Sequence, residues 1–219
     1  MRAAFSFIRD QAGSVLVEFT VLLPIFFLLV LGSVDFLLAM YQWNAAAKAV
    51  QLGARIAATS TPVATGLRGL STAVLGGTVT VGDSMPSFAV TCNGATTTCA
   101  CIGTCTGVSG YSSSAMNTIV YGRGSTSCGD ATANYHAGMC DIFPRIAPVN
   151  VSITYEQTGM GYAGRPDGPV PTVTVKLQNL TFQLYFAGAL LPFNSLTMPA
   201  MTTTITGEDL CSVDPDTGC

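Results

Sequence analysis

Residues 13–40 read GSVLVEFTVLLPIFFLLVLGSVDFLLAM, a run in which only Glu18 and Asp35 carry charge. The part from Phe19 to Met40 would span about 33 Å as an α-helix, and the hydrocarbon core of a bilayer is about 30 Å thick. The stretch therefore predicts one membrane-spanning helix.

The helical pattern continues beyond the apolar run through NAAAKAVQLGARIAA, residues 44–58. Pro62 ends it just past Ser60, because proline cannot continue a helix. A helix from about Val15 to Ser60 would be about 70 Å long, so we expect it to cross a membrane and extend beyond it. Pro24 should bend this helix, since it lacks a backbone N–H.

A cleaved secretory signal is the first alternative to a retained helix. Such a signal has an apolar region of about 7–15 residues followed by small residues at the cut. Ala45, Ala46 and Ala47 could supply that site, which would release a disulfide-rich secreted protein at Ala47. The apolar run is longer than such a signal and the helical pattern does not stop there, so we favour the retained helix.

The two acids of the apolar run have an ordinary explanation. A charged acid at the bilayer centre costs roughly 2.5–3.5 kcal/mol on insertion scales. Glu18 and Asp35 are separated by about 25 Å of helix, so both could lie near opposite membrane interfaces, where this cost is small. On composition alone Glu18 is an acid at a membrane edge.

The composition of the whole chain fits a protein that is only partly solvated. The 219 residues are 49% hydrophobic and 10% charged, whereas soluble domains contain about 25% charged residues. The formal net charge of -3 offers no basic face, so we expect no nucleic-acid partner.

Eight cysteines lie after residue 90 in a region rich in glycine, serine and threonine. An even number in this context favours disulfides and an oxidising compartment, which places the C-terminal part outside the cytosol. A metal site is less favoured, because there is no CxxC pair and His136 is the only histidine; we expect neither a metal nor a cofactor. The pairing is left open among these candidates: Cys92, Cys99, Cys101, Cys105, Cys128, Cys140, Cys211 and Cys219.

The N-terminal residues RDQAGSVLVEF, 9–19, resemble a type IV prepilin leader, with a short charged leader over residues 1–13 and Gly13 at the cut. Residues 13–58 further resemble the TadE/TadG-like pilus-assembly family. The elements that match in order are Val17-Glu18-Phe19, Pro24, Asp35, Asn44-Ala45-Ala46 and Gly53-Ala54-Arg55.

This resemblance implies a role for Glu18. A cut after Gly13 would expose an ammonium on Ser14, and the attraction of that ammonium to a carboxylate is strong in a low dielectric. Glu18, Phe19 and Pro24 would then belong to the assembly segment. The implied protein is a minor pilin or pseudopilin of a Tad-type (Flp) pilus or secretion apparatus. Its implied partners are other pilin or pseudopilin subunits, a prepilin peptidase and the pilus assembly platform, at the bacterial inner membrane.

The remaining residues, 61–219, predict a β-rich, disulfide-rich extracytoplasmic domain, so the fold class is α+β with an antiparallel sheet. Alternating apolar residues mark a strand in VNVSITYEQ, 149–157, and one or two more in residues 171–186, where Val173, Val175 and Leu177 share a face. A glycine- and proline-rich loop joins them, which favours an antiparallel hairpin. Further strands are expected at Gly77–Val81, Phe88–Thr91, Thr118–Tyr121 and from Met201; residues 187–193 should form a helical turn or loop in the core.

No catalytic motif is present, and we expect that the chain is not an enzyme. His136 reads as a loop residue, and Asp130, Asp141 and Glu156 are candidates only because acids are few. Asp214 and Asp216 resemble the opening of a calcium loop, but that loop needs 12 positions; a turn closed by Cys211–Cys219 is favoured. The alternative function is a membrane-anchored extracytoplasmic binding protein that does not polymerise.

Overall fold

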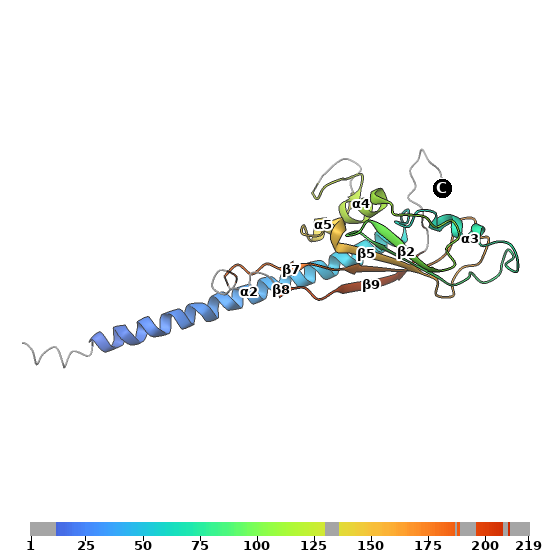
Figure 1. The fold of residues 1–219 in the computed structure, drawn as a ribbon. Coiled ribbons are helices and arrows are strands. Elements are labelled where there is room, and N and C mark those ends of the chain that lie inside the picture. The colour runs from blue at the N-terminus through green and yellow to red at the C-terminus, as the bar shows by residue number, and fades with distance from the viewer. Residues whose placement is uncertain (1–11, 130–135, 187, 189–195, 208–209, 211–219) are drawn as a thin grey trace, which may run out of the picture. The chain divides into compact units, whose positions relative to one another are not determined.

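The computed structural model describes residues 12–129, 136–186, 188, 196–207 and 210 (Figure 1). The chain divides into two compact units. The first unit comprises Met1–Tyr41 and Phe182–Leu196, and the second comprises Gln42–Thr181 and Thr197–Cys219.

One long helix, α2, runs from Ala12 to Ala58 and is continuous through Pro24. The expected helix is therefore confirmed, within three residues at each end. Its C-terminal end is stabilised by the hydroxyl of Thr59, which donates a hydrogen bond to the carbonyl oxygen of Arg55 at 3.0 Å. Arg55 in the last turn also complements the negative end of the helix dipole.

An antiparallel sheet with the strand order β2-β1-β5-β6-β9 forms the centre of the second unit. The expected hairpin is β5 paired with β6, and the strands expected at Phe88 and from Met201 are β1 and β9; all are confirmed. Strand β2 was not expected. The bounds are β1 (Phe88–Asn93), β2 (Thr98–Gly103), β5 (Val151–Glu156), β6 (Thr172–Leu177) and β9 (Met201–Thr206).

Short elements complete the described fold. They are η1 (Leu67–Gly69), α3 (Leu70–Ala73), α4 (Ser113–Tyr121), β3 (Gly122–Arg123), β4 (His136–Ala137), α5 (Met139–Ile142), η2 (Pro148–Asn150), β7 (Thr181–Phe182) and β8 (Leu196–Thr197). Strands β3 and β4 pair with each other, as do β7 and β8.

The inner face of the sheet carries the apolar residues of the alternating pattern. On β5 Val151, Ile153 and Tyr155 are all buried, and their partners on β6 are buried as well. The Tyr155 hydroxyl accepts a hydrogen bond from the backbone N–H of Val63 at 3.0 Å. This bond satisfies the one polar group of a fully buried side chain and ties the segment after α2 to the sheet.

The opposite face of the sheet is polar. Thr91, Thr154, Thr174 and Thr204 lie in register on four neighbouring strands. Thr91 and Thr154 share a hydrogen bond of 3.0 Å between their hydroxyls, and so do Thr174 and Thr204. One face packed on the core and one solvated face produce the alternation seen in the sequence.

Two expected strands are wrong. Residues 118–121 belong to helix α4, because the hydroxyl of Ser112 accepts from the N–H of Ala115 and caps the helix at 3.2 Å. Residues 77–81 form no strand, because Gly76 and Val79 close a tight turn with two backbone hydrogen bonds of 3.0 and 3.1 Å. Gly77 in that turn has φ +58°, which favours glycine.

Several sequence expectations fall outside the described residues. They concern the leader up to residue 11, Asp130, residues 187 and 189–193, and the tail with Cys211, Asp214, Asp216 and Cys219. These expectations stay predictions.

Candidate functional site

The N-terminal part of α2, Val15 to Met40, exposes an almost unbroken apolar surface. Its exposed fractions reach 66% at Val15, 64% at Phe26 and 68% at Leu29. The helix is long and apolar enough to cross a membrane. Apolar side chains facing outward on every side of a helix are typical of a segment surrounded by lipid or by other helices.

Two polar side chains in this part of α2 bond to the helix itself. The hydroxyl of Thr20 donates to the carbonyl oxygen of Val17 at 2.8 Å, and that of Ser33 donates to the carbonyl oxygen of Leu29 at 2.7 Å. Both hydroxyls therefore satisfy a donor without water, as an apolar environment requires.

Asp35 differs sharply from its neighbours on the helix. It is only 2% exposed, whereas Phe36 is 65% exposed. Its carboxylate accepts hydrogen bonds from the backbone N–H groups of Tyr185 (3.0 Å to Oδ1) and Phe186 (3.0 Å to Oδ2 and 3.3 Å to Oδ1). A segment 150 residues away along the chain thus binds the second acid of the apolar run. Sequence reasoning placed Asp35 at a membrane edge and missed this partner, which no local pattern signals.

Glu18 lies one helical turn after Ser14 in α2. Residues four apart lie on the same face of a helix. The backbone nitrogen that a cut after Gly13 would turn into an ammonium is therefore on the face that carries the Glu18 carboxylate.

A family model described as TadE-like protein matches residues 13–55. Residues 13–55 form a TadE-like segment. The match confirms the resemblance read from the sequence for these residues. No curated protein and no solved structure matches the chain.

The C-terminal part of the TadE-like segment, from Gln42 onward, packs into the second unit. Gln42 is buried, and the guanidinium of Arg145 donates to its side-chain oxygen at 3.3 Å. A stripe of small residues faces the core, so neighbouring elements can approach the helix closely; its buried members are Ala45, Ala46, Ala49, Gly53, Ala54, Ala57 and Ala58.

The packing around position 53 of the TadE-like segment requires a glycine. A Cβ atom at this position would lie 2.4 Å from the sulfur of Met139 on helix α5. The absent side chain leaves room for the buried Met139, so α5 packs directly against α2.

Six of the eight cysteines form disulfides in the described residues. Cys92–Cys99 joins opposite positions of β1 and β2, and the other pairs are Cys101–Cys105 and Cys128–Cys140. The close spacing of Cys99, Cys101 and Cys105 thus reflects two separate bridges. The two cysteines of each bridge are 12 positions or fewer apart in the sequence, so each bridge stabilises the fold by about 3 kcal/mol at most in the loop-entropy model.

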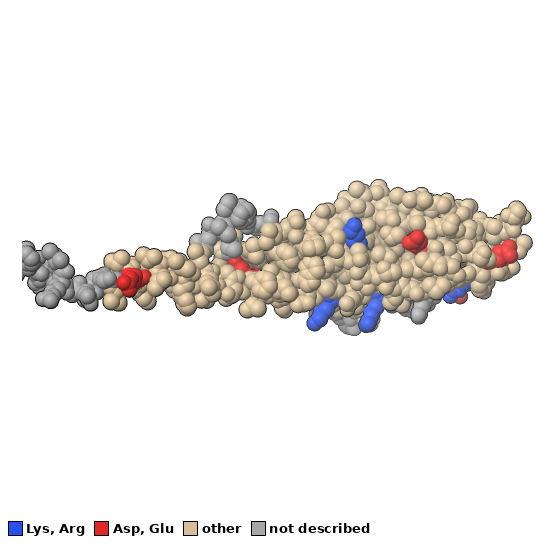
Figure 2. All heavy atoms as spheres, turned by 90° about the horizontal axis from the view of Figure 1, so that it is seen from below, with Lys and Arg blue, Asp and Glu red and all other residues tan. Residues whose placement is uncertain are grey.

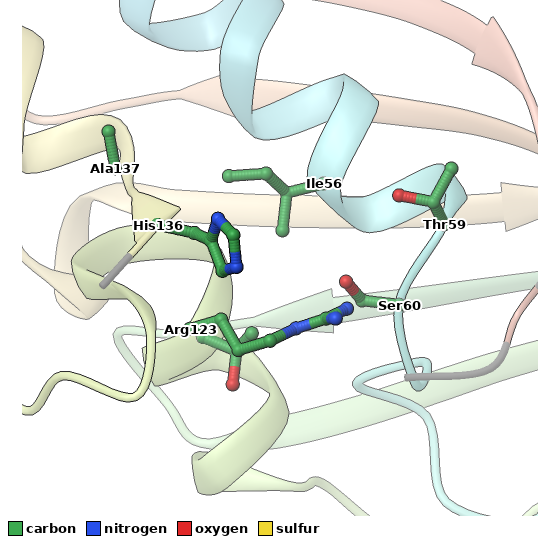
Figure 3. A pocket seen from close by; sticks show the side chains of 7 residues that line it. Ile56, Thr59, Ser60, Arg123, His136 and Ala137 are labelled. Atoms are coloured by element: carbon green, nitrogen blue, oxygen red, sulfur yellow. The ribbon is translucent and has the colours of Figure 1, made fainter. Parts of the chain in front are cut away.

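A shallow pocket of about 230 Å³ lies in the second unit where the end of α2 meets the β3–β4 pair (Figure 3). Arg123 and His136 are opposite each other in that pair, and the Arg123 guanidinium points toward Ser60 (Figure 3). The remaining lining side chains are Ile56, Thr59, Thr118 and Ala137. Among the described residues that line the pocket, no nucleophile and base are in hydrogen-bond contact.

Asp141 and Glu156, two of the acids considered for catalysis, are not among the residues that line this pocket. Asp141 accepts from the backbone N–H groups of Gly129 (3.0 Å) and Gly138 (2.7 Å), which stabilises the start of α5. Glu156 is exposed at the end of β5. Charged side chains are sparse and scattered on the face shown in Figure 2.

Proposed function

We propose that this chain is a minor pilin or pseudopilin of a Tad-type pilus or secretion apparatus, cut after Gly13 and anchored by α2 in the inner membrane. The observation that carries the proposal is the TadE-like match, which begins at Gly13 and includes the exposed apolar part of α2. The exposed apolar surface of α2 suits such a subunit both in the membrane and in an assembled bundle of pilin helices, because both surroundings are apolar.

In this proposal Glu18 binds the new ammonium of Ser14, in the same or a neighbouring subunit. The two groups are one turn apart on α2, and their attraction is strong where water is excluded. The pair would fix the axial position of one helix against the next. The second unit, held outside the cytosol, would contact other subunits, a surface or a secretion partner, without catalysis.

The cut is tested on the full chain coexpressed with a prepilin peptidase. We expect intact-mass analysis and N-terminal sequencing to show a mature protein that begins at Ser14, and Gly13→Val to abolish the cut. The matched control is Gly32→Val, because nothing lies within 4 Å of a Cβ atom at Gly32 on the same helix. Recovery of intact Met1, or of a chain that begins near Lys48, would contradict the proposal.

The pairing of Glu18 is tested with Glu18→Gln in the processed chain. We expect at least a tenfold loss of co-purifying pilus subunits, since a buried ammonium would lose its carboxylate partner. Glu156→Gln removes an exposed carboxylate from the second unit and should change nothing. Wild-type recovery with Glu18→Gln would exclude the pairing role.

The alternative is an anchored binding protein that does not polymerise. Recovery of the protein from sheared surface filaments or from a pilus-assembly complex favours the pilin, and recovery from membranes alone favours the alternative.

A further inference from the structure

The apolar run is longer than one bilayer requires, so two registers of the membrane are possible. If the hydrocarbon core covers Phe19 to Met40, Asp35 lies inside it. If it covers Val15 to Val34, about 30 Å of helix, Asp35 lies just outside. The contacts of Asp35 within the first unit distinguish these registers.

The partner of Asp35 is an irregular segment. Residues 183–186 are neither helix nor strand, and Gln183, Tyr185 and Phe186 are exposed. Lipid-exposed irregular backbone does not occur within the hydrocarbon region, because its N–H and C=O groups would lack partners. A segment that bonds to Asp35 through its backbone is therefore incompatible with a register that buries Asp35 in lipid tails.

Exposed aromatic side chains follow Val34 in the first unit, both on α2 and in residues 182–186. Phe36 is 65% exposed, Tyr41 71%, Tyr185 60% and Phe186 38%. Tyrosine is enriched at membrane–water interfaces, where its ring meets apolar groups and its hydroxyl meets water, and Tyr41 and Tyr185 fit this position.

We propose that Asp35 and residues 182–186 form an interfacial clamp that sets the depth of α2, with the hydrocarbon core ending at Val34 and the clamp among the lipid headgroups. The carboxylate of Asp35 remains satisfied by two backbone N–H groups at this depth. Tyr185 and Phe186 rest in the headgroup layer and resist movement of the helix in either direction. The clamp depends on the membrane span but not on the Gly13 cut or on polymerisation.

Depth-dependent tryptophan quenching tests the register. Trp43 is the only tryptophan, so Trp43→Phe gives a dark background in the full chain, and Trp43→Tyr is a second background if the first does not fold. Single tryptophans replace Ile25, Leu29 or Tyr185 in vesicles whose phospholipids are brominated near the headgroup or near the acyl-chain end. Circular dichroism verifies the helix of each variant.

We expect the tryptophan at position 25 to be quenched most by the deep bromine, since it lies at the centre of the register from Val15 to Val34. The tryptophan at position 185 should be quenched most by the shallow bromine. In the competing register position 29 is central instead, which is a difference of about 6 Å in depth. Deepest quenching at position 29, or absence of lipid quenching at position 185, would overturn the proposal. If the span itself is wrong, lipids quench none of the three positions.

A second arm tests the clamp itself. Asp35→Leu removes the acceptor of the two N–H groups, so the deepest position should shift from 25 toward 29. Ser33→Leu is the matched control, because the Ser33 hydroxyl donates to the carbonyl oxygen of Leu29 in its own helix. If both variants leave position 25 deepest, or both shift it equally, Asp35 does not set the depth.

Discussion

At the residue scale, individual hydrogen bonds join distant segments of the chain within each of the two units. The Tyr155 hydroxyl and the Asp35 carboxylate both accept backbone N–H groups from distant segments. In each case a buried polar side chain is compensated by a hydrogen bond to the backbone. Removing the Tyr155 hydroxyl leaves the buried N–H of Val63 without this acceptor and costs free energy.

Tyr155→Phe is expected to lower the free energy of unfolding by about 1–3 kcal/mol, because Val63 N–H loses its acceptor in the core. Chemical denaturation of the full chain in detergent measures this loss. The control is Tyr162→Phe, since Tyr162 is 44% exposed. Equal stability of the two variants would show that the bond contributes little.

Tyr155→Phe should also change how the free energy of unfolding depends on pH. Burial raises the pKa of the Tyr155 hydroxyl well above its ordinary value. The folded state then holds its proton where the unfolded state releases it, so stability is lost as the pH rises above about 10. Tyr155→Phe should therefore reduce the loss of stability at alkaline pH. Part of that loss should remain, because burial also raises the pKa of Tyr111.

At the element scale, helix α2 carries two different surfaces along one continuous helix. Large apolar residues cover the part before Met40, and a stripe of small residues follows from Ala45. The first surface suits lipid or other helices, and the second allows close packing within the second unit.

Glycines on the two parts of α2 should therefore respond differently to substitution. Gly53→Leu is expected to destabilise the fold by about 1–3 kcal/mol or more, since Met139 occupies the space a side chain needs. Gly32→Leu should leave the stability unchanged or slightly raised, because the space around Gly32 is open. Thermal unfolding of both variants makes the comparison. Equal melting temperatures would contradict the two-surface description.

At the scale of the whole molecule, the disulfides report the compartment of the second unit. Cyanogen bromide cleaves after methionine, and Met139 separates Cys128 from its partner Cys140. In protein isolated from native membranes, fragments 117–139 and 140–160 should stay linked until a reductant is added. Mass spectrometry with and without reductant is the measurement. Separation without reductant would place this part of the chain in a reducing compartment.

The long helix and the hairpin could be read from the sequence because their signals are local. Apolar length predicts α2, and period-two alternation predicts β5, β6 and the inward position of Tyr155. The same logic failed at residues 118–121, where a short β-branched run lies in a helix that Ser112 caps. It also failed at residues 77–81, where the turn at Gly76 prevents a strand.

The sequence by itself determined the long apolar helix, the TadE-like segment and the number of cysteines, since each depends on composition or spacing along the chain. Tertiary structure decided the three described disulfide pairs, the space that Gly53 leaves for Met139 and the partner of Asp35. These contacts join residues whose separation along the chain carries no signal. Only folding brings Tyr185 to within hydrogen-bond distance of an acid that otherwise reads as a charge in an apolar helix.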